Sequence, residues 1–228
     1  GIGARTYKLN YSFSLLFQDK VTARLLLELR AKGVEGLILV DLEPGKNTNL
    51  PFPTVVCSWP ESTNLESLSI SQLHFPYWTA FQLAFTHLAE YANHPLVESQ
   101  IANWATQIGI TITILPTESA APGGYVATDK IAASLLPDAF VTFNDSLAIG
   151  VLRALTRKGV QVPEDVVMVS CNDDPPASYS EPPLTTVRMP WFSLGERAVD
   201  LLIDNPQSRP AILPKLVIRE SCGSLFWV

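Results

Sequence analysis

The chain has 228 residues, of which 47% are hydrophobic and 17% charged, so it can bury a large core and is not globally disordered. Its net charge of −6 repels polyanions, which argues against this segment binding nucleic acid or an anionic membrane by overall electrostatic attraction. No apolar run approaches the roughly 20 residues of a membrane helix, and three widely spaced cysteines argue against a disulfide framework or zinc site and favour a reduced, cytoplasmic setting.

The first half of the chain alternates predicted strands with predicted helices. Apolar runs rich in strand-forming residues predict strands at residues 12–17, 36–41, 54–58 and 67–71. Apolar residues at helical spacing predict helices at residues 21–29, 77–90 and 101–108. Asp19 is the expected cap of the first helix, and Gly33 is its expected stop.

The second half repeats the same alternation. Strands are predicted at residues 111–115, 139–143, 166–171, 185–188 and 216–219, and helices begin near residues 123, 144 and 194. Asn144 and Asp145 are the expected cap of the second of these helices. Short loops between alternating strands and helices imply parallel sheets with helices on both faces. In such sheets ligands bind beyond the carboxyl ends of the strands. Polar residues gather at those predicted ends, namely Asp41, Ser58, residues 144–145 and residues 172–174.

The three histidines, His74, His87 and His94, lie close together in the sequence and invite comparison with a metal site. Their spacings match no common ligand motif, so we interpret them as surface or helix-flank residues. No motif for nucleotide binding, zinc proteolysis or nucleophilic hydrolysis is present. We therefore expect neither a metal nor a cofactor.

Three aspartates allow more than one interpretation. Asp145, Asp173 and Asp174 could form a carboxylate pair for acid–base catalysis, could cap helices and turns, or could accept hydrogen bonds from the hydroxyls of a small polar ligand. No nucleophile with its base stands beside them. We therefore expect binding rather than catalysis, and no enzyme.

From residue 137 to residue 223 the sequence resembles the lactose-repressor (LacI/GalR) family of transcription regulators. Residues 143–150 (FNDSLAIG) resemble the family signature SNDxxAxG, and residues 159–166 (GVQVPEDV) resemble its G…VPxDV turn. Residues 171–174 (CNDD) stand where the family has GFDD, and residues 182–188 (PPLTTVR) resemble PPLTTVRQP. The first half matches more weakly, chiefly at residues 33–39 (GVEGLIL).

This resemblance implies an α/β fold of the periplasmic-binding-protein-like type I class. Two doubly wound parallel-sheet lobes would enclose a ligand cleft between them. Residues 1–91 with 191–211 would form the N-terminal lobe, and residues 92–190 with 212–228 would form the C-terminal lobe. Residues 1–10 resemble the back half of the family's first helix, so the family's first strand is expected outside these residues.

The resemblance also assigns ligand-binding roles to Asn144, Asp145, Asp173 and Trp191. Short polar side chains beside a helix N-terminus suit hydroxyl groups, and an aromatic ring suits the C–H face of a sugar. A structural role remains the alternative for the two aspartates, and a place in the core at the lobe junction is the alternative for Trp191.

The implied function is that of the effector-sensing core of a DNA-binding regulator, which binds a small polar ligand such as a sugar. A helix-turn-helix head outside this chain would contact operator DNA, and homodimerisation would present two heads. The alternative is a free-standing periplasmic-type binding protein for sugar uptake. Two departures from the family bear on the ligand: residues 71–76 replace the usual DNxxGG, and no arginine occurs between Arg30 and Arg153.

Overall fold

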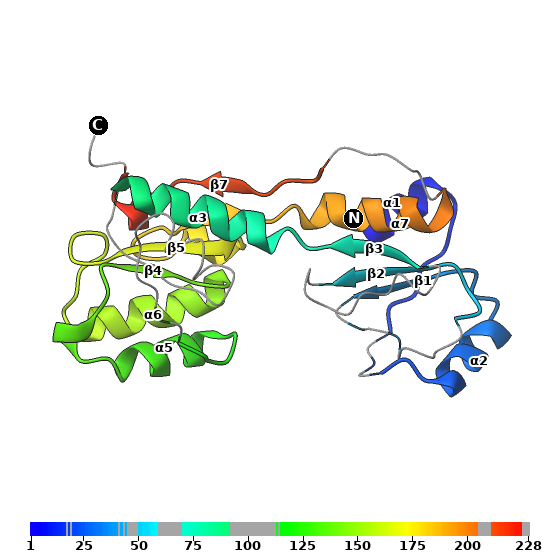
Figure 1. Cartoon of the computed structure of the whole chain (residues 1–228), viewed down its shortest axis with the longest axis horizontal. Helices are drawn as coiled ribbons and strands as arrows, with labels where there is room; N and C mark the ends of the chain where they lie inside the picture. Colours follow the sequence, from blue (N-terminus) through cyan, green and yellow to red (C-terminus); the bar gives the residue numbers. More distant parts are fainter. Residues whose placement is uncertain are drawn as a thin grey trace. The chain divides into compact units, whose positions relative to one another are not determined.

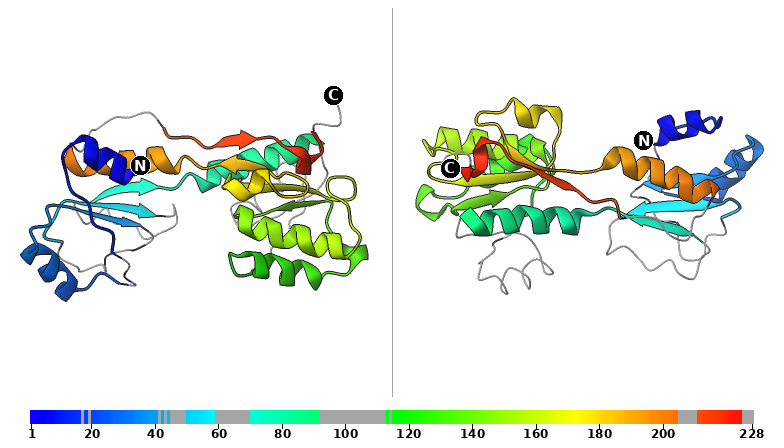
Figure 2. Two further views of the ribbon diagram at one scale, coloured as in Figure 1. Left: turned by 180° about the vertical axis from the view of Figure 1, so that it is seen from behind. Right: turned by 90° about the horizontal axis from the view of Figure 1, so that it is seen from above.

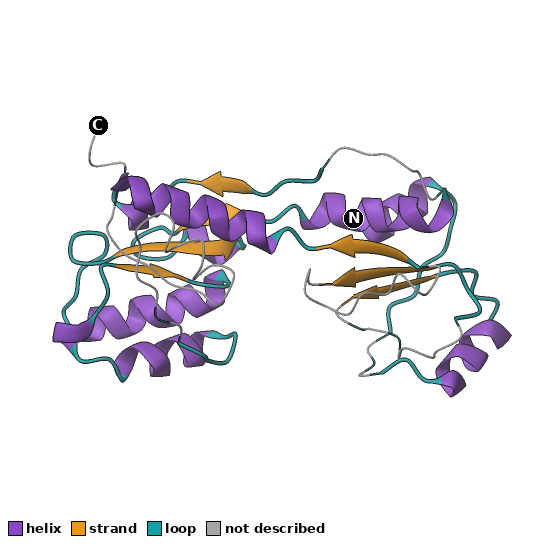
Figure 3. Ribbon diagram, in the orientation of Figure 1, coloured by secondary structure: helices purple, strands orange, loops and turns teal. Residues whose placement is uncertain are grey.

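The computed structural model describes residues 1–16, 18, 20–40, 42, 44, 50–58, 70–91, 113, 115–204 and 211–224. The chain divides into two compact units. The N-terminal unit comprises Gly1–Tyr77 and Pro190–Ile212, and the C-terminal unit comprises Trp78–Met189 and Leu213–Val228. Each unit contains both strands and helices (Figure 3).

The N-terminal unit is built on a parallel sheet of three described strands. These are β1 (Leu37–Val40), β2 (Thr54–Ser58) and β3 (Ser71–His74), in the order β1-β2-β3 (Figure 1). Val55 and Val56 on the central strand are fully buried. A strand buried on both faces is what the continuous apolar run TVVCS predicts.

Two helices pack together beside this sheet. Helix α7 (Trp191–Ile203) contacts the strands, and α1 (Ile2–Lys8) lies against α7 (Figure 2). A Cβ atom on Gly195 would come within 2.8 Å of the backbone nitrogen of Ile2, so a glycine is needed for this close approach. Arg5 of α1 donates to Asp200 of α7 at 2.7 Å.

Helix α2 (Ala23–Ala31) follows the predicted pattern with a different cap. Thr22 is the N-cap, and its side chain accepts a hydrogen bond from the backbone amide of Leu25 at 3.2 Å. Leu26 and Leu29 are buried, and the chain leaves the helix through Gly33 at φ +74°. A positive φ is the conformation that makes glycine the favoured stop residue.

The C-terminal unit contains a four-stranded sheet in the order β4-β5-β6-β7. The strands are β4 (Ala139–Val141), β5 (Val167–Asn172), β6 (Thr185–Arg188) and β7 (Lys215–Val217). The first three are parallel, and β7 runs antiparallel to β6. The register places Asn172 beside Arg188, and Arg188 beside Lys215.

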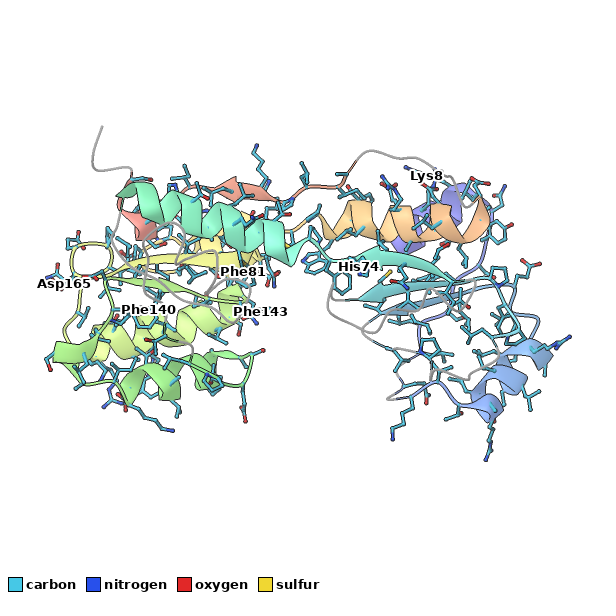
Figure 4. All side chains as sticks on the ribbon, in the orientation of Figure 1. Lys8, His74, Phe81, Phe140, Phe143 and Asp165 are labelled. Atoms are coloured by element: carbon cyan, nitrogen blue, oxygen red, sulfur yellow. The ribbon has the colours of Figure 1, made fainter. Side chains whose placement is uncertain are left out.

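Helices cover both faces of this sheet. Helices α5 (Ala121–Asp129) and α6 (Asp145–Arg157) lie side by side below the strands in Figure 1, and α3 (Tyr77–Tyr91) lies above them. Phe81 of α3 packs on Phe143 with ring centroids 5.9 Å apart (Figure 4). Three short 3₁₀ helices complete the unit, η1 (Ala133–Leu135), η2 (Pro175–Ser178) and η3 (Glu220–Cys222).

The core of the C-terminal unit lies between α6 and the sheet. Its buried members are Phe140, Ala148, Val151, Leu152, Leu155, Val166, Met168, Ala177 and Leu184. Apolar residues on one face of α6 recur at the helical spacing seen in the sequence, so this face turns to the sheet.

Most predicted elements are confirmed. The strands at residues 54–58 and 185–188 have the predicted bounds, and the helix predicted at 77–90 is α3. The prediction of an α/β fold with parallel sheets is confirmed.

One strand prediction in the first half is wrong. Residues 12–16 form neither helix nor strand, and Phe13, Leu15 and Leu16 are exposed, because no described strand pairs with them. The strand predicted at residues 67–71 shares only Ser71 with β3 (Ser71–His74), and residues 67–69 lie outside the described residues. Asp19, the helix at 101–108 and most of the strand at 111–115 also lie outside the described residues.

Within the described parts of the chain, no helix combines the length and apolar character that crossing a membrane requires.

Candidate functional site

Polar side chains gather at the carboxyl edge of the C-terminal sheet. Asn144 follows β4, Asp173 follows β5, and Arg188 is the last residue of β6. These three strands are parallel neighbours, so their carboxyl ends meet at one edge. This is the place where open α/β sheets bind ligands.

Asn144 caps helix α6. Its Oδ1 accepts a hydrogen bond from the backbone amide of Leu147 at 2.8 Å, as the sequence predicts. Its Nδ2 donates to the carbonyl oxygen of Ser119 at 3.2 Å. The two bonds fix the orientation of the amide, and the residue remains partly exposed.

Asp145 is fully buried at the first position of α6. Its Oδ2 accepts from the backbone amide of Asp174 at 2.7 Å, and its Oδ1 accepts from the hydroxyl of Thr186 at 2.8 Å. Burial raises the pKa of this carboxyl group, while the hydrogen bonds from the Asp174 amide and the Thr186 hydroxyl oppose the rise. Both oxygens therefore bind groups of the C-terminal unit, and they tie the start of α6 to β6 and to the loop after β5.

The loop after β5 has an unusual backbone. Asn172 and Asp173 have φ angles of +105° and +59°, which non-glycine residues seldom adopt. Such strain persists where surrounding contacts hold it, and it concentrates at functional sites. Here the amide of Asp173 donates to Thr186 Oγ1 at 3.3 Å, and the amide of Asp174 donates to Asp145.

The carboxylate of Asp173 lies between two arginines. Its Oδ2 accepts from Arg188 Nε at 2.6 Å and its Oδ1 accepts from Arg219 Nη2 at 2.7 Å, while the side chain is 6% exposed. Nη1 of Arg219 also donates to the carbonyl oxygen of Leu184 at 2.7 Å. Arg219 is thus largely enclosed, whereas the Arg188 side chain is 58% exposed.

Neither arginine was among the residues that the sequence singled out. Arg188 was detectable, because it is the last residue of the strand predicted at residues 185–188, and ligands were expected beyond such strand ends. Arg219 was not, because 46 residues separate it from Asp173 and no local pattern links the two.

Trp191 belongs to the N-terminal unit, where it is the first residue of α7. Its ring meets Phe75 edge to face, with centroids 5.4 Å apart and an interplanar angle of 79°. Trp191 keeps 39% of its surface exposed. Phe75 directly follows β3, whose last residue, His74, is exposed (Figure 4). The structure thus brings Asn144, Asp145 and Asp173 to one sheet edge and places Trp191 in the other unit.

The structure agrees with the predictions for the cysteines and only in part with those for the remaining histidines. His87 is buried within α3, so the surface alternative of its surface or helix-flank interpretation is wrong, and its imidazole lowers the pKa of the Cys222 thiol. His94 lies outside the described residues. Cys57, Cys171 and Cys222 are buried and form no disulfide. No three His, Cys, Asp or Glu side chains cluster as a metal site within the described ranges.

Comparison with protein families supports the fold. Residues 72–222 match the family described as a periplasmic binding protein-like domain. The chain is 30% identical over 207 residues to the HTH-type transcriptional regulator MalR of Streptomyces coelicolor, an alignment that covers 86% of this chain and 58% of that protein. It is 42% identical over 87 residues to the lactose operon repressor of Rhizobium radiobacter, covering 38% of this chain and 77% of the relative.

Solved structures show the same fold at low sequence identity. A LacI family transcriptional regulator from Enterococcus faecium with bound ribose aligns with a TM-score of 0.71 and 21% identity, over 96% of this chain and 90% of that chain. The lac repressor dimer bound to operator and the anti-inducer ONPF aligns with a TM-score of 0.75 and 22% identity, over 96% and 86%. The chain spans 58% of the length of MalR, so it corresponds to only part of that relative.

Proposed function

Because the chain belongs to the periplasmic binding protein-like domain family, and its predicted resemblance to LacI/GalR effector-binding domains is confirmed, we propose that it is the effector-sensing core of a DNA-binding transcriptional regulator. The observation that carries the proposal is the polar edge formed by Asn144, Asp173 and Arg188 at the carboxyl ends of neighbouring parallel strands. The relatives with matching sequence include the HTH-type transcriptional regulator MalR of Streptomyces coelicolor and the lactose operon repressor of Rhizobium radiobacter, which supports the proposal.

The proposed effector is a small polar molecule, a sugar or a sugar derivative. The Enterococcus faecium regulator of the same fold holds ribose, which supports this class of ligand. Asn144 and Asp173 would hydrogen-bond its hydroxyl groups, and Trp191 would stack on a C–H face. Asp145, with both oxygens engaged, would hold the loop that presents Asp173.

The proposed partners are a second copy of the chain and operator DNA. The structure of the lac repressor is that of a dimer on its operator, which supports this arrangement. Contact with DNA would pass through a helix-turn-helix head that these residues do not include, and the protein would act in the cytoplasm without enzymatic activity. For an effector to control DNA binding, it must bind one conformation of the protein more tightly than the other.

A free-standing sugar-binding protein for uptake is the second candidate, since it shares the fold. The names of the relatives favour the regulator. The coding sequence upstream of Gly1 distinguishes the two candidates. A basic helix-turn-helix domain there supports the regulator, whereas a signal peptide would overturn it.

Calorimetric titration of the chain with pentoses, hexoses and disaccharides tests effector binding. We expect at least one sugar to bind and to raise the melting temperature. Asp173→Asn should weaken that binding about tenfold or more, because a hydrogen bond to a charged group is lost. Asp129→Asn, at an exposed carboxylate on α5, is the matched control and should leave the Kd unchanged. Equal affinities for the wild type and Asp173→Asn would remove Asp173 from the site.

A further inference from the structure

We propose that the effector carries an acidic group, a carboxylate or a phosphate, and that Arg188 binds it. This inference rests on the proposed effector-sensing function and specifies the chemical class of the effector. The observation behind it is the contact between Asp173 and Arg188, which holds an exposed guanidinium group at the edge of the C-terminal sheet.

The guanidinium group of Arg188 is oriented by one hydrogen bond and keeps further donors for a ligand. Its Nε donates to Asp173 Oδ2 at 2.6 Å, which fixes the plane of the guanidinium group. A guanidinium group has five N–H donors, four of them on the two terminal nitrogens. Neither terminal nitrogen of Arg188 forms a hydrogen bond within the described part of the chain, and 58% of the side chain is exposed. A fixed pair of terminal nitrogens is the geometry that binds carboxylate or phosphate through two parallel hydrogen bonds.

Asp173 is suited to holding this group in place. Its second oxygen accepts from Arg219 at 2.7 Å, and its side chain is 6% exposed. Arg219 is itself anchored by a bond from Nη1 to the carbonyl oxygen of Leu184. The two short bonds of the Asp173 carboxylate therefore go to guanidinium groups. A ligand at this edge meets the exposed face of Arg188 together with the lone pairs that Asp173 retains.

The local charges also favour an anion. Lys215 lies directly across from Arg188 in the antiparallel pair of β6 and β7, and both residues are exposed. Like charges opposite each other destabilise a sheet, and a bound anion would offset this repulsion. With Arg219, three cationic side chains stand here with three carboxylates, those of Asp145, Asp173 and Asp174. Asp145 is fully buried, so the exposed groups among these six are the cations Arg188 and Lys215 and the single carboxylate of Asp174.

The other arginines of the described C-terminal unit lie elsewhere. Arg153 and Arg157 belong to α6. Arg157 donates to the hydroxyl of Tyr125 and lies over its ring, with the guanidinium carbon 5.7 Å from the centroid. Arg153 is exposed, so it provides a matched control for loss of one arginine charge.

The test is calorimetric titration of the chain at two salt concentrations. Ribose and glucose are the neutral ligands, ribose 5-phosphate and glucose 6-phosphate form the phosphate arm, and glucuronate forms the carboxylate arm. Inorganic phosphate and acetate test whether the anion alone is enough. The variants are Arg188→Gln, Arg188→Lys and the control Arg153→Gln, each checked by circular dichroism and thermal melting.

We expect one acidic ligand to bind more tightly than its neutral counterpart and to weaken as salt rises. Arg188→Gln should raise its Kd about 10- to 100-fold, Arg188→Lys should give an intermediate loss, and Arg153→Gln should change it less than about twofold. Tighter binding of the neutral sugar would overturn the inference while leaving the effector-sensing function in place. Equal effects of Arg188→Gln and Arg153→Gln would also overturn it. Failure of every sugar and sugar acid to bind would count against both proposals.

Discussion

The hydroxyl of Thr186 donates to Oδ1 of Asp145 at 2.8 Å, across 41 residues of sequence. The same hydroxyl accepts from the amide of Asp173 at 3.3 Å. Asp145 also accepts from the next amide along, that of Asp174. One buried carboxylate therefore holds the loop whose backbone is strained at Asn172 and Asp173. Because that loop presents Asp173 to Arg188, the stability of the site depends on a group that lies beneath it.

Asp145→Ala should destabilise the protein by about 3 kcal/mol, because the buried hydroxyl of Thr186 and the partly buried amide of Asp174 both lose their acceptor. Urea unfolding followed by circular dichroism measures the loss. Asp129→Ala, at an exposed carboxylate in the same unit, should change stability by less than about 0.5 kcal/mol. Similar losses in the two variants would show that the bonds of Asp145 contribute little.

Gly150→Ala should destabilise the protein by at least about 2 kcal/mol, because helices α5 and α6 touch at this glycine. A Cβ atom there would lie 1.9 Å from the carbonyl oxygen of Ala121 and 2.8 Å from the amide nitrogen of Tyr125. Gly3→Ala in α1 is the matched control, since its Cβ would come no closer than 3.4 Å to Phe13. That change should stabilise by about 0.5 kcal/mol through helix propensity. Thermal melting of both variants separates the two effects, and a neutral Gly150→Ala would contradict the close packing.

The local pattern predicted those elements whose cause is local. The run TVVCS predicted β2 because Val55 and Val56 are buried on both faces of the sheet. Asn144 was predicted as a cap because its partner, the amide of Leu147, is three residues away. The same pattern failed at residues 12–16, where an apolar run has no described partner strand and remains exposed.

The site was predicted only in part, because its geometry depends on distant residues. Asp145 and Asp173 were both singled out, but the partners that determine their roles were not. Thr186 is 41 residues from Asp145, and Arg219 is 46 residues from Asp173. Neither pairing follows from periodicity or spacing along the chain. Gly150 likewise stands at the glycine position of the SNDxxAxG-like segment because the backbone of helix α5 leaves no room for a Cβ atom there. The pattern of its own helix, α6, does not reveal this requirement.

Arg5→Gln should destabilise the N-terminal unit by about 1.5 kcal/mol, because Asp200 is buried on α7 and loses a charged donor at 2.7 Å. Lys8→Gln removes a second cation of α1, whose partner Glu196 lies 3.8 Å away with both side chains more exposed. Exposed pairs contribute little, so this variant should lose less than about 0.5 kcal/mol. Urea unfolding of the two single variants measures the difference. A larger effect at Lys8 than at Arg5 would reverse the assignment.

The Cys222 thiol is the group whose titration should be visible near neutral pH. Burial by itself would raise its pKa, but hydrogen bonds with His87, Ser224 and Thr185 lower it from an ordinary value of 9.0 to about 7. The thiol lies 3.0 Å from Thr185 Oγ1 and 3.1 Å from Ser224 Oγ. The folded protein therefore favours the thiolate in a range where the unfolded chain still binds the proton.

Because the folded pKa of Cys222 lies below the unfolded value, its contribution to stability is complete above about pH 9 and is lost as the pH falls through about 7. We expect the free energy of unfolding of the wild type, relative to Cys222→Ser, to rise by about 1–2 kcal/mol between these limits. Cys171→Ala is the control: burial raises the pKa of Cys171, so this thiol stays protonated across the window. That variant should lower stability evenly and keep the wild-type slope. Urea unfolding at half-unit pH steps measures both, and parallel curves for wild type and Cys222→Ser would rule out the thiolate.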